Sequence, residues 1–138
     1  RDDPQPLPAV QAGTNWLLPE GKDLSGADLS GSNFLGADLA YCNLTGANLR
    51  RANLRKANLT GAYLFGADLT GADLSEARLA SANLEWSTLE GASLSNALLA
   101  KANLVRANLT EADLRTADLT EADLRLTNFY GANIELFC

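Results

Sequence analysis

The sequence predicts an all-β solenoid in which the chain winds as stacked square coils. A five-residue unit repeats without interruption from Ala47 to Leu74, with Ala at its first position and Leu at its third. Leucine at every fifth residue cannot line a helix, because a five-residue step turns about 500° and moves the stripe by roughly 140°. A straight strand is excluded too, since its inward side chains recur at every second residue. The chain must therefore bend once per unit.

Four bends of about 90° close a square after twenty residues, and stacked squares lie about 4.8 Å apart. The central position recurs 23 times from Leu24 to Ile134, and only Phe34, Phe129 and Ile134 replace Leu. Two residues before it, a small inward residue, almost always Ala, fills the space beside the large one. No insertion interrupts this spacing, which predicts about six coils.

These units, written Ala-(Asp/Asn)-Leu-x-x, resemble the repeats of the pentapeptide-repeat family. The resemblance covers residues 22–136 and implies the fold of that family, a right-handed quadrilateral β-helix. Within the family, the chain is most similar to the exported lumenal and periplasmic members of cyanobacteria and plant plastids.

The two residues after each central Leu should form the corners of the coil. Where the second of them is Gly, a type II turn is expected, because that turn needs a positive φ there. Where it is bulky, we expect a distorted corner; the bulky positions are Arg51, Lys56, Glu76, Trp86 and Arg106. The Asn or Asp before each Leu should bond nearby backbone groups and stack on its counterpart twenty residues later. These carboxylates are therefore interpreted as structural.

The chain divides into an N-terminal lead and cap at residues 1–21, the repeat at 22–136 and a C-terminal tail at 137–138. All four prolines lie in the first part, which predicts an extended lead, and Pro8 can open a short helical turn there. A solenoid needs its open end covered. The apolar cluster of Trp16, Leu17 and Leu18 is the predicted cap.

The C-terminal end has less to cover it, because only four residues follow the last coil. Its apolar side chains are Leu126, Phe129, Ile134, Leu136 and Phe137. Exposed apolar surface of this kind pairs readily with a second copy. We therefore expect a homodimer through the C-terminal end.

Composition gives no indication of catalysis. The 138 residues contain no His, which removes histidine bases, histidine metal ligands and Ser-His or Cys-His relays. The uninterrupted repeat offers neither a phosphate-binding loop nor a loop of concentrated acidic ligands. We predict that the protein is not an enzyme and has no cofactor or metal. Its net charge of −6 argues against direct nucleic-acid binding, and no run of about twenty apolar residues is present to span a membrane.

The chain contains no Met, even at position 1. We interpret it as a processed product whose signal peptide has been removed on export to the thylakoid lumen or periplasm. A trimmed cytoplasmic chain is the alternative. Cys42 fills a small inward position and Cys138 ends the chain, so in register they would lie roughly 19 Å apart, too far for one disulfide. A bond between two copies through Cys138 stays open.

Charge is distributed unevenly along the repeat. Residues 42–61 contain Arg50, Arg51, Arg55 and Lys56 and no acid, whereas the neighbouring twenty-residue stretches are net acidic. These four cations are the candidate interaction patch, for an acidic protein surface or anionic lipid headgroups. The competing interpretation is that they neutralise acids in adjacent coils, with Asp28, Asp68 and Asp73 as partners.

Two functions compete at this stage. The first is a non-enzymatic scaffold, a rigid rod that presents side chains at fixed spacing to an unknown protein partner. The second follows from the resemblance: a DNA mimic, similar to the pentapeptide-repeat proteins that inhibit or protect DNA gyrase. A mimic should carry acid along its length, and the four cations interrupt that pattern. We therefore favour the scaffold.

Overall fold

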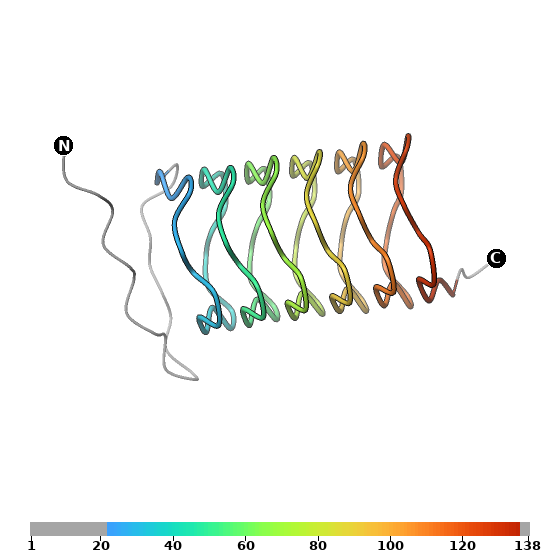
Figure 1. Ribbon diagram of the computed structural model, residues 1–138, viewed down its shortest axis with the longest axis horizontal. Helices are drawn as coiled ribbons and strands as arrows, with labels where there is room; N and C mark the ends of the chain where they lie inside the picture. The colour runs from blue at the N-terminus through green and yellow to red at the C-terminus, as the bar shows by residue number, and fades with distance from the viewer. Residues whose placement is uncertain (1–21, 136–138) are drawn as a thin grey trace.

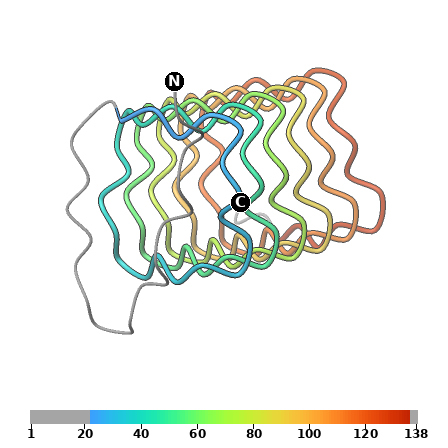
Figure 2. The same cartoon turned by 60° about the vertical axis from the view of Figure 1, so that its left-hand side comes forward.

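The computed structural model describes residues 22–135, which form a stack of coils along one axis (Figure 1). The β-structure of this part consists of single-residue bridges, all of them parallel, each joining two residues twenty apart. The first joins Asp23 to Asn43 and the last joins Asp113 to Asn133. Twenty residues are four five-residue units, so each coil has four sides, and seen obliquely the sides of successive coils lie over one another (Figure 2).

We number the coils by this period. Coil 1 is residues 22–41, coil 2 is 42–61, coil 3 is 62–81, coil 4 is 82–101, coil 5 is 102–121, and coil 6 is the described remainder, 122–135.

A regular hydrogen-bond ladder connects the coils. In one unit, the Asn48 N–H donates to the Ala27 carbonyl in the coil before (2.9 Å), and the Leu49 N–H donates to the Asp68 carbonyl in the coil after (2.7 Å). Within the corner, the Ala52 N–H donates back to the Leu49 carbonyl (3.1 Å). The same pattern recurs at unit after unit, so the interior backbone groups are paired although no strand is longer than a bridge in residues 22–135.

The core is the stacked layer of central and small residues that the spacing predicts. Leu74, at the middle of the stack, has no exposed surface, and neither has Phe34. One polar departure from Ala has an internal hydrogen-bond partner. Ser87 is buried and donates its hydroxyl hydrogen to the Leu84 carbonyl, at 2.6 Å. Cys42 is buried as a free thiol.

The prediction of distorted corners at bulky residues is wrong. Each corner has two residues, and the second of them has a positive φ at every corner from residue 26 to residue 131. This φ lies between 58° and 62° at the thirteen non-glycine positions and between 65° and 69° at the nine glycines. Arg51 and Trp86 adopt the same left-handed conformation as Gly71. The physical reason is the ladder: the Arg51 N–H donates to the Thr70 carbonyl at 2.9 Å, and the Trp86 N–H donates to the Val105 carbonyl at 3.0 Å. These bonds hold the corner in place whichever side chain it bears.

The prediction for the Asn and Asp residues is confirmed. Their Oδ1 atoms accept hydrogen bonds from the backbone N–H two residues later, as Asn48 does from Arg50 at 3.1 Å. They also stack along the axis: the side-chain amide of Asn53 donates to Asn33 Oδ1 one coil earlier, at 3.1 Å. The bridge columns therefore carry mostly polar side chains, interrupted by Tyr63 and Leu98.

The two ends of the described stack differ in burial. In coil 1, Leu24 is 5% exposed and Leu29 is 1% exposed. In coil 6, Leu124 and Phe129 are only partly buried, and Ile134 is 38% exposed. The predicted cap and the helical turn after Pro8 lie outside the described residues, as do Leu136, Phe137 and Cys138. Pairing of two copies at the C-terminal end stays a prediction.

Candidate interaction surfaces

The charged side chains of residues 22–135 lie outside the buried core. No three His, Cys, Asp or Glu side chains within residues 22–135 are grouped so as to hold a metal ion. The same residues contain no helix that is both long and apolar enough to cross a membrane. The candidate functional features are therefore on the outer surface of the rod.

The basic patch, Arg50, Arg51, Arg55 and Lys56, occupies two successive corners of coil 2, and all four residues are exposed. Two of its members are paired. Arg50 lies 3.1 Å from Asp68 Oδ2, and Arg55 lies 2.8 Å from Glu76 Oε1, both in coil 3. Arg51 and Lys56 form no ion pair with any residue from 22 to 135. Half of the predicted patch is thus neutralised by the next coil, and half is open.

The expected acidic partners were only partly right. Asp68 is the partner of Arg50, as predicted, but Arg55 reaches Glu76 in place of Asp73. Asp73 instead accepts hydrogen bonds from the backbone and hydroxyl of Ser75, at 2.9 and 2.5 Å. Asp28 accepts from Ser30 and from the Asn48 amide. The carboxylates of Asp28 and Asp73 accept hydrogen bonds from serines two residues later in the same corner, and neither forms an ion pair with a cation of the patch.

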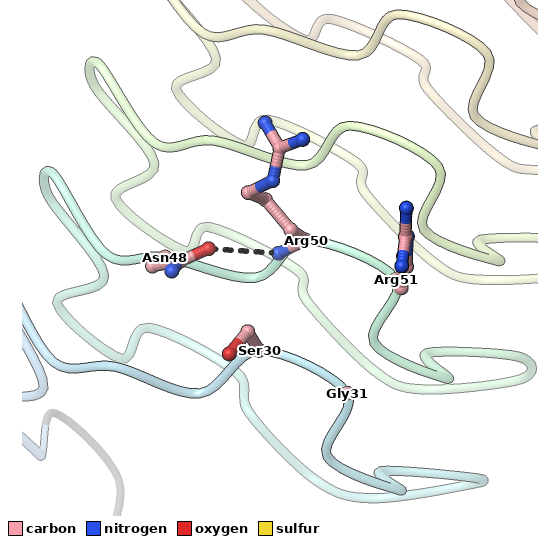
Figure 3. A pocket seen from close by; sticks show the side chains of 5 residues that line it. All are labelled: Ser30, Gly31, Asn48, Arg50 and Arg51. Atoms are coloured by element: carbon pink, nitrogen blue, oxygen red, sulfur yellow. Dashed lines mark hydrogen bonds between the residues drawn. The ribbon is translucent and has the colours of Figure 1, made fainter.

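A shallow groove of about 500 Å³ adjoins the basic patch between coils 1 and 2. Its lining residues are Ser30, Gly31, Asn48, Arg50 and Arg51. Figure 3 shows the two arginine side chains rising from coil 2 on the side away from Ser30 and Gly31. Gly31 has no side chain, and a Cβ added there would meet nothing within 4 Å. The groove is therefore an open polar notch below the two arginines, whose guanidinium groups extend toward coil 3.

The carboxylate of Asp68 is held ionised by its surroundings. Partial burial opposes ionisation, but hydrogen bonds from the Thr70 hydroxyl and backbone and from Arg50 outweigh it and lower the pKa of Asp68. The Arg115 guanidinium and backbone likewise lower the pKa of Asp113. Burial, in contrast, raises the pKa of the Cys42 thiol. A reactive thiolate at Cys42 is therefore not favoured.

The repeat itself decides the family. The family description "Pentapeptide repeats" matches this chain in eight copies, over residues 23–55, 42–80, 57–96, 77–115 and 107–135. The chain belongs to the pentapeptide-repeat family. Proteins of this family form right-handed quadrilateral β-helices, and the twenty-residue period described above is that of a four-sided coil.

Solved pentapeptide-repeat structures are similar to this chain. Rfr23 from the cyanobacterium Cyanothece 51142 is 32% identical, with a TM-score of 0.68 over 83% of this chain and 89% of its own. The protein alr5209 from Nostoc PCC 7120 is 30% identical, with a TM-score of 0.60 over 83% and 85%. AT2G44920 from the Arabidopsis thaliana thylakoid lumen is 38% identical, with a TM-score of 0.35 over 71% and 68%. A comparison with curated proteins finds no match.

This pentapeptide-repeat chain has a second surface that the repeat pattern did not indicate. Tyr63, Phe65, Trp86, Val105 and Leu126 lie on one side of the rod and its corner, from coil 3 to coil 6; we call them the aromatic stripe. Four of them are exposed, by 52% at Tyr63, 43% at Phe65, 52% at Trp86 and 68% at Leu126. The sequence contains a signal for this surface: Phe65, Trp86, Val105 and Leu126 are apolar outward positions spaced by 21, 19 and 21 residues.

Proposed function

We propose that this pentapeptide-repeat protein is a non-enzymatic interaction scaffold, a right-handed quadrilateral β-helix that holds side chains at fixed spacing for an acidic protein partner. The observation that carries the proposal is the basic patch, two of whose cations, Arg51 and Lys56, form no ion pair within residues 22–135. Cations are scarce on a chain of net charge −6, and here four of the eleven lie on one coil. Location after export, in the thylakoid lumen or periplasm, is part of the same proposal.

The rigidity of the rod supports this function. Ladder hydrogen bonds on both sides of coil 2 fix the backbone of Arg51, whose N–H donates to Thr70. A partner therefore meets the cations at a set spacing and orders only their side chains, which limits the entropy lost on binding. The exposed pairs with Asp68 and Glu76 stabilise the fold by only about 0–1 kcal/mol each, so exchanging them for a partner's carboxylates costs little.

The DNA-mimic alternative receives less support. A mimic presents acid along its length, but coil 2 carries four cations and no acid. The loops that gyrase-binding members carry are also missing from residues 22–135, where the five-residue spacing continues unbroken. The scaffold therefore accounts for the charge pattern better than the mimic does.

The experiment compares two four-cation variants of the full chain. In the first, Arg50, Arg51, Arg55 and Lys56 are all replaced by Gln. In the control, four cations on other coils are replaced by Gln; they are Arg78, Lys101, Arg115 and Arg125. Both lose the same charge, so a difference between them reports the patch and not the net charge.

Binding of a fluorescent acidic peptide is followed by anisotropy at about 0.05 and 0.3 M salt. We expect salt-sensitive binding by the unmodified chain and the control, and loss of binding in the patch variant with little change in its unfolding midpoint. Equal binding by both variants would remove the patch from the proposal. A lowered midpoint with binding retained would leave the cations a purely structural role.

A further inference from the structure

Trp86 lies near the centre of the aromatic stripe and is 52% exposed. The Arg106 guanidinium lies over the indole, with its central carbon 5.0 Å from the ring centroid, and this cation–π contact fixes the ring on the coil 5 side. One coil earlier on the same corner is Gly66, where an added Cβ would meet nothing within 4 Å. The indole N–H makes no hydrogen bond to any residue from 22 to 135. The surface at Gly66 is thus open, and the Trp86 indole N–H is a donor that no residue from 22 to 135 uses.

Beyond Trp86 the stripe continues as a groove of about 490 Å³, lined by Val105, Arg106, Arg125 and Leu126. Its two cations differ in availability. Arg125 is already engaged by Asp123, with its Nε 2.9 Å from Oδ1 and an Nη 2.6 Å from Oδ2. Arg106 makes no ion pair within the described coils. An apolar floor next to a guanidinium that stacks on Trp86 and has no carboxylate partner within the described coils favours an apolar ligand that carries a carboxylate.

The dimensions of the stripe restrict what can occupy it. From coil 3 to coil 6 it runs about 14 Å at a coil spacing of about 4.8 Å, and one side of the square is about 10 Å wide, as three extended residues are. That gives roughly 140 Å², well below the roughly 800 Å² per partner that a stable dimer interface buries. A second copy is therefore a poor occupant, and a single extended segment running along the stack fits.

The spacing of the coils selects the conformation of that segment. A polyproline II helix returns to the same face every three residues, about 9.3 Å, which nearly equals two coil spacings of about 9.6 Å. An extended β-strand returns every two residues, about 6.6 Å, and matches neither one coil nor two. Phe65 in coil 3 and Val105 in coil 5, with Glu85 between them in the same column, are thus in register with prolines three residues apart.

We propose that the aromatic stripe docks a proline-rich segment of a partner protein, in polyproline II conformation and with an acidic residue beside its prolines. The proline rings pack against Phe65, Trp86 and Val105, as such segments do in aromatic-lined grooves generally. The Trp86 indole N–H donates to a carbonyl of the segment, because a polyproline II helix leaves its carbonyls unpaired. Arg106 pairs with the acidic residue. This surface lies away from the basic patch on coil 2, and the inference does not rest on the function proposed for that patch.

The test uses the full chain and a nine-residue peptide with two Pro-x-x-Pro repeats and a C-terminal Glu, titrated by calorimetry. The chain should bind the peptide, and Trp86→Ala and Phe65→Ser should each weaken binding by about tenfold or more, since a truncated anchor in an interface commonly costs that much. Tyr130→Ala is the matched control, because Tyr130 is 76% exposed but lies on another corner, in the column of Arg50. It should bind within about twofold of the unmodified chain.

Two further measurements complete the design. A peptide with its prolines replaced by Ala should lose binding, and Arg106→Gln should weaken binding of the Glu peptide more than binding of its Gln counterpart. Unfolding midpoints of all variants should stay unchanged, since the altered side chains are largely outside the core. The inference is overturned if the chain does not bind the proline peptide, if Trp86→Ala binds it as well as Tyr130→Ala does, or if the alanine peptide binds equally. Dimerisation abolished by Trp86→Ala, without peptide binding, would assign the stripe to a second copy and overturn it too.

Discussion

Replacing Leu74 by Ala should destabilise the protein more than any comparable change on its surface. Leu74 has no exposed area and lies mid-stack, with Leu54 and Leu94 at the equivalent positions one coil away on either side. The change removes three carbons from a fully buried side chain. At about 0.8 kcal/mol for each, the lost transfer free energy is roughly 2.4 kcal/mol.

A cavity adds to this loss. The ladder holds the layers above and below at a fixed spacing, with the Leu74 N–H donating to the Ser93 carbonyl at 2.7 Å, so the coils cannot collapse into the gap. We therefore expect the free energy of unfolding to fall by about 3–4 kcal/mol, within the usual range for a buried Leu→Ala change.

Urea unfolding followed by circular dichroism measures this loss, with two leucines as internal comparisons. Leu98 points outward and is 46% exposed, so Leu98→Ala should cost under about 1 kcal/mol. Leu124 is in a central position but is only partly buried in coil 6, so the free energy lost on Leu124→Ala should lie between the losses at Leu74 and Leu98. Equal losses at Leu74 and Leu98 would refute the assignment of inward and outward positions. An equal loss at Leu74 and Leu124 would refute the gradient of burial toward coil 6.

Three other outcomes follow from the geometry. At the corners, Gly36→Ala should cost about 1 kcal/mol, because a left-handed φ of 68° is retained and no neighbour obstructs the new methyl group, while Ser81→Gly should relieve strain and be neutral or stabilising in the same urea assay; the opposite order would mean that the corners relax. In acid, hydrogen bonds from Thr120 lower the pKa of Asp118 below its unfolded value, so its stabilising contribution is complete above about pH 4 and is lost as the pH falls through the lower folded pKa. A pH series of thermal midpoints should therefore decline only below about pH 4, and Asp118→Asn, which keeps the acceptor, should decline less; a midpoint that falls between pH 7 and 5 would contradict this. In a Cys138→Ser background, the buried Cys42 should react with Ellman's reagent only as urea unfolds the chain, and rapid reaction of the native protein would show that its layer opens.

The register of the core could be predicted because it depends on local spacing. A residue such as Leu74 must face inward once its neighbours at five-residue intervals do, and burial confirms this along the stack. The basic patch was also visible, since Arg50, Arg51, Arg55 and Lys56 are adjacent in sequence as well as in space. Their partners were harder to predict, because whether Arg55 reaches Asp73 or Glu76 depends on side-chain directions that the spacing does not set.

The sequence by itself therefore determined the period, the two inward residues of each unit, the Asn and Asp ladders and the family. The tertiary structure alone decided the corners, where hydrogen bonds between coils impose one backbone conformation on Gly71 and Arg51 alike. It also assembled the aromatic stripe, since Phe65, Trp86 and Leu126 come from coils 3, 4 and 6 and share one corner of the rod only because the coils stack with a period of twenty residues. Contacts along the axis join residues far apart in the chain, and a five-residue pattern carries no information on which outward side chains will meet there.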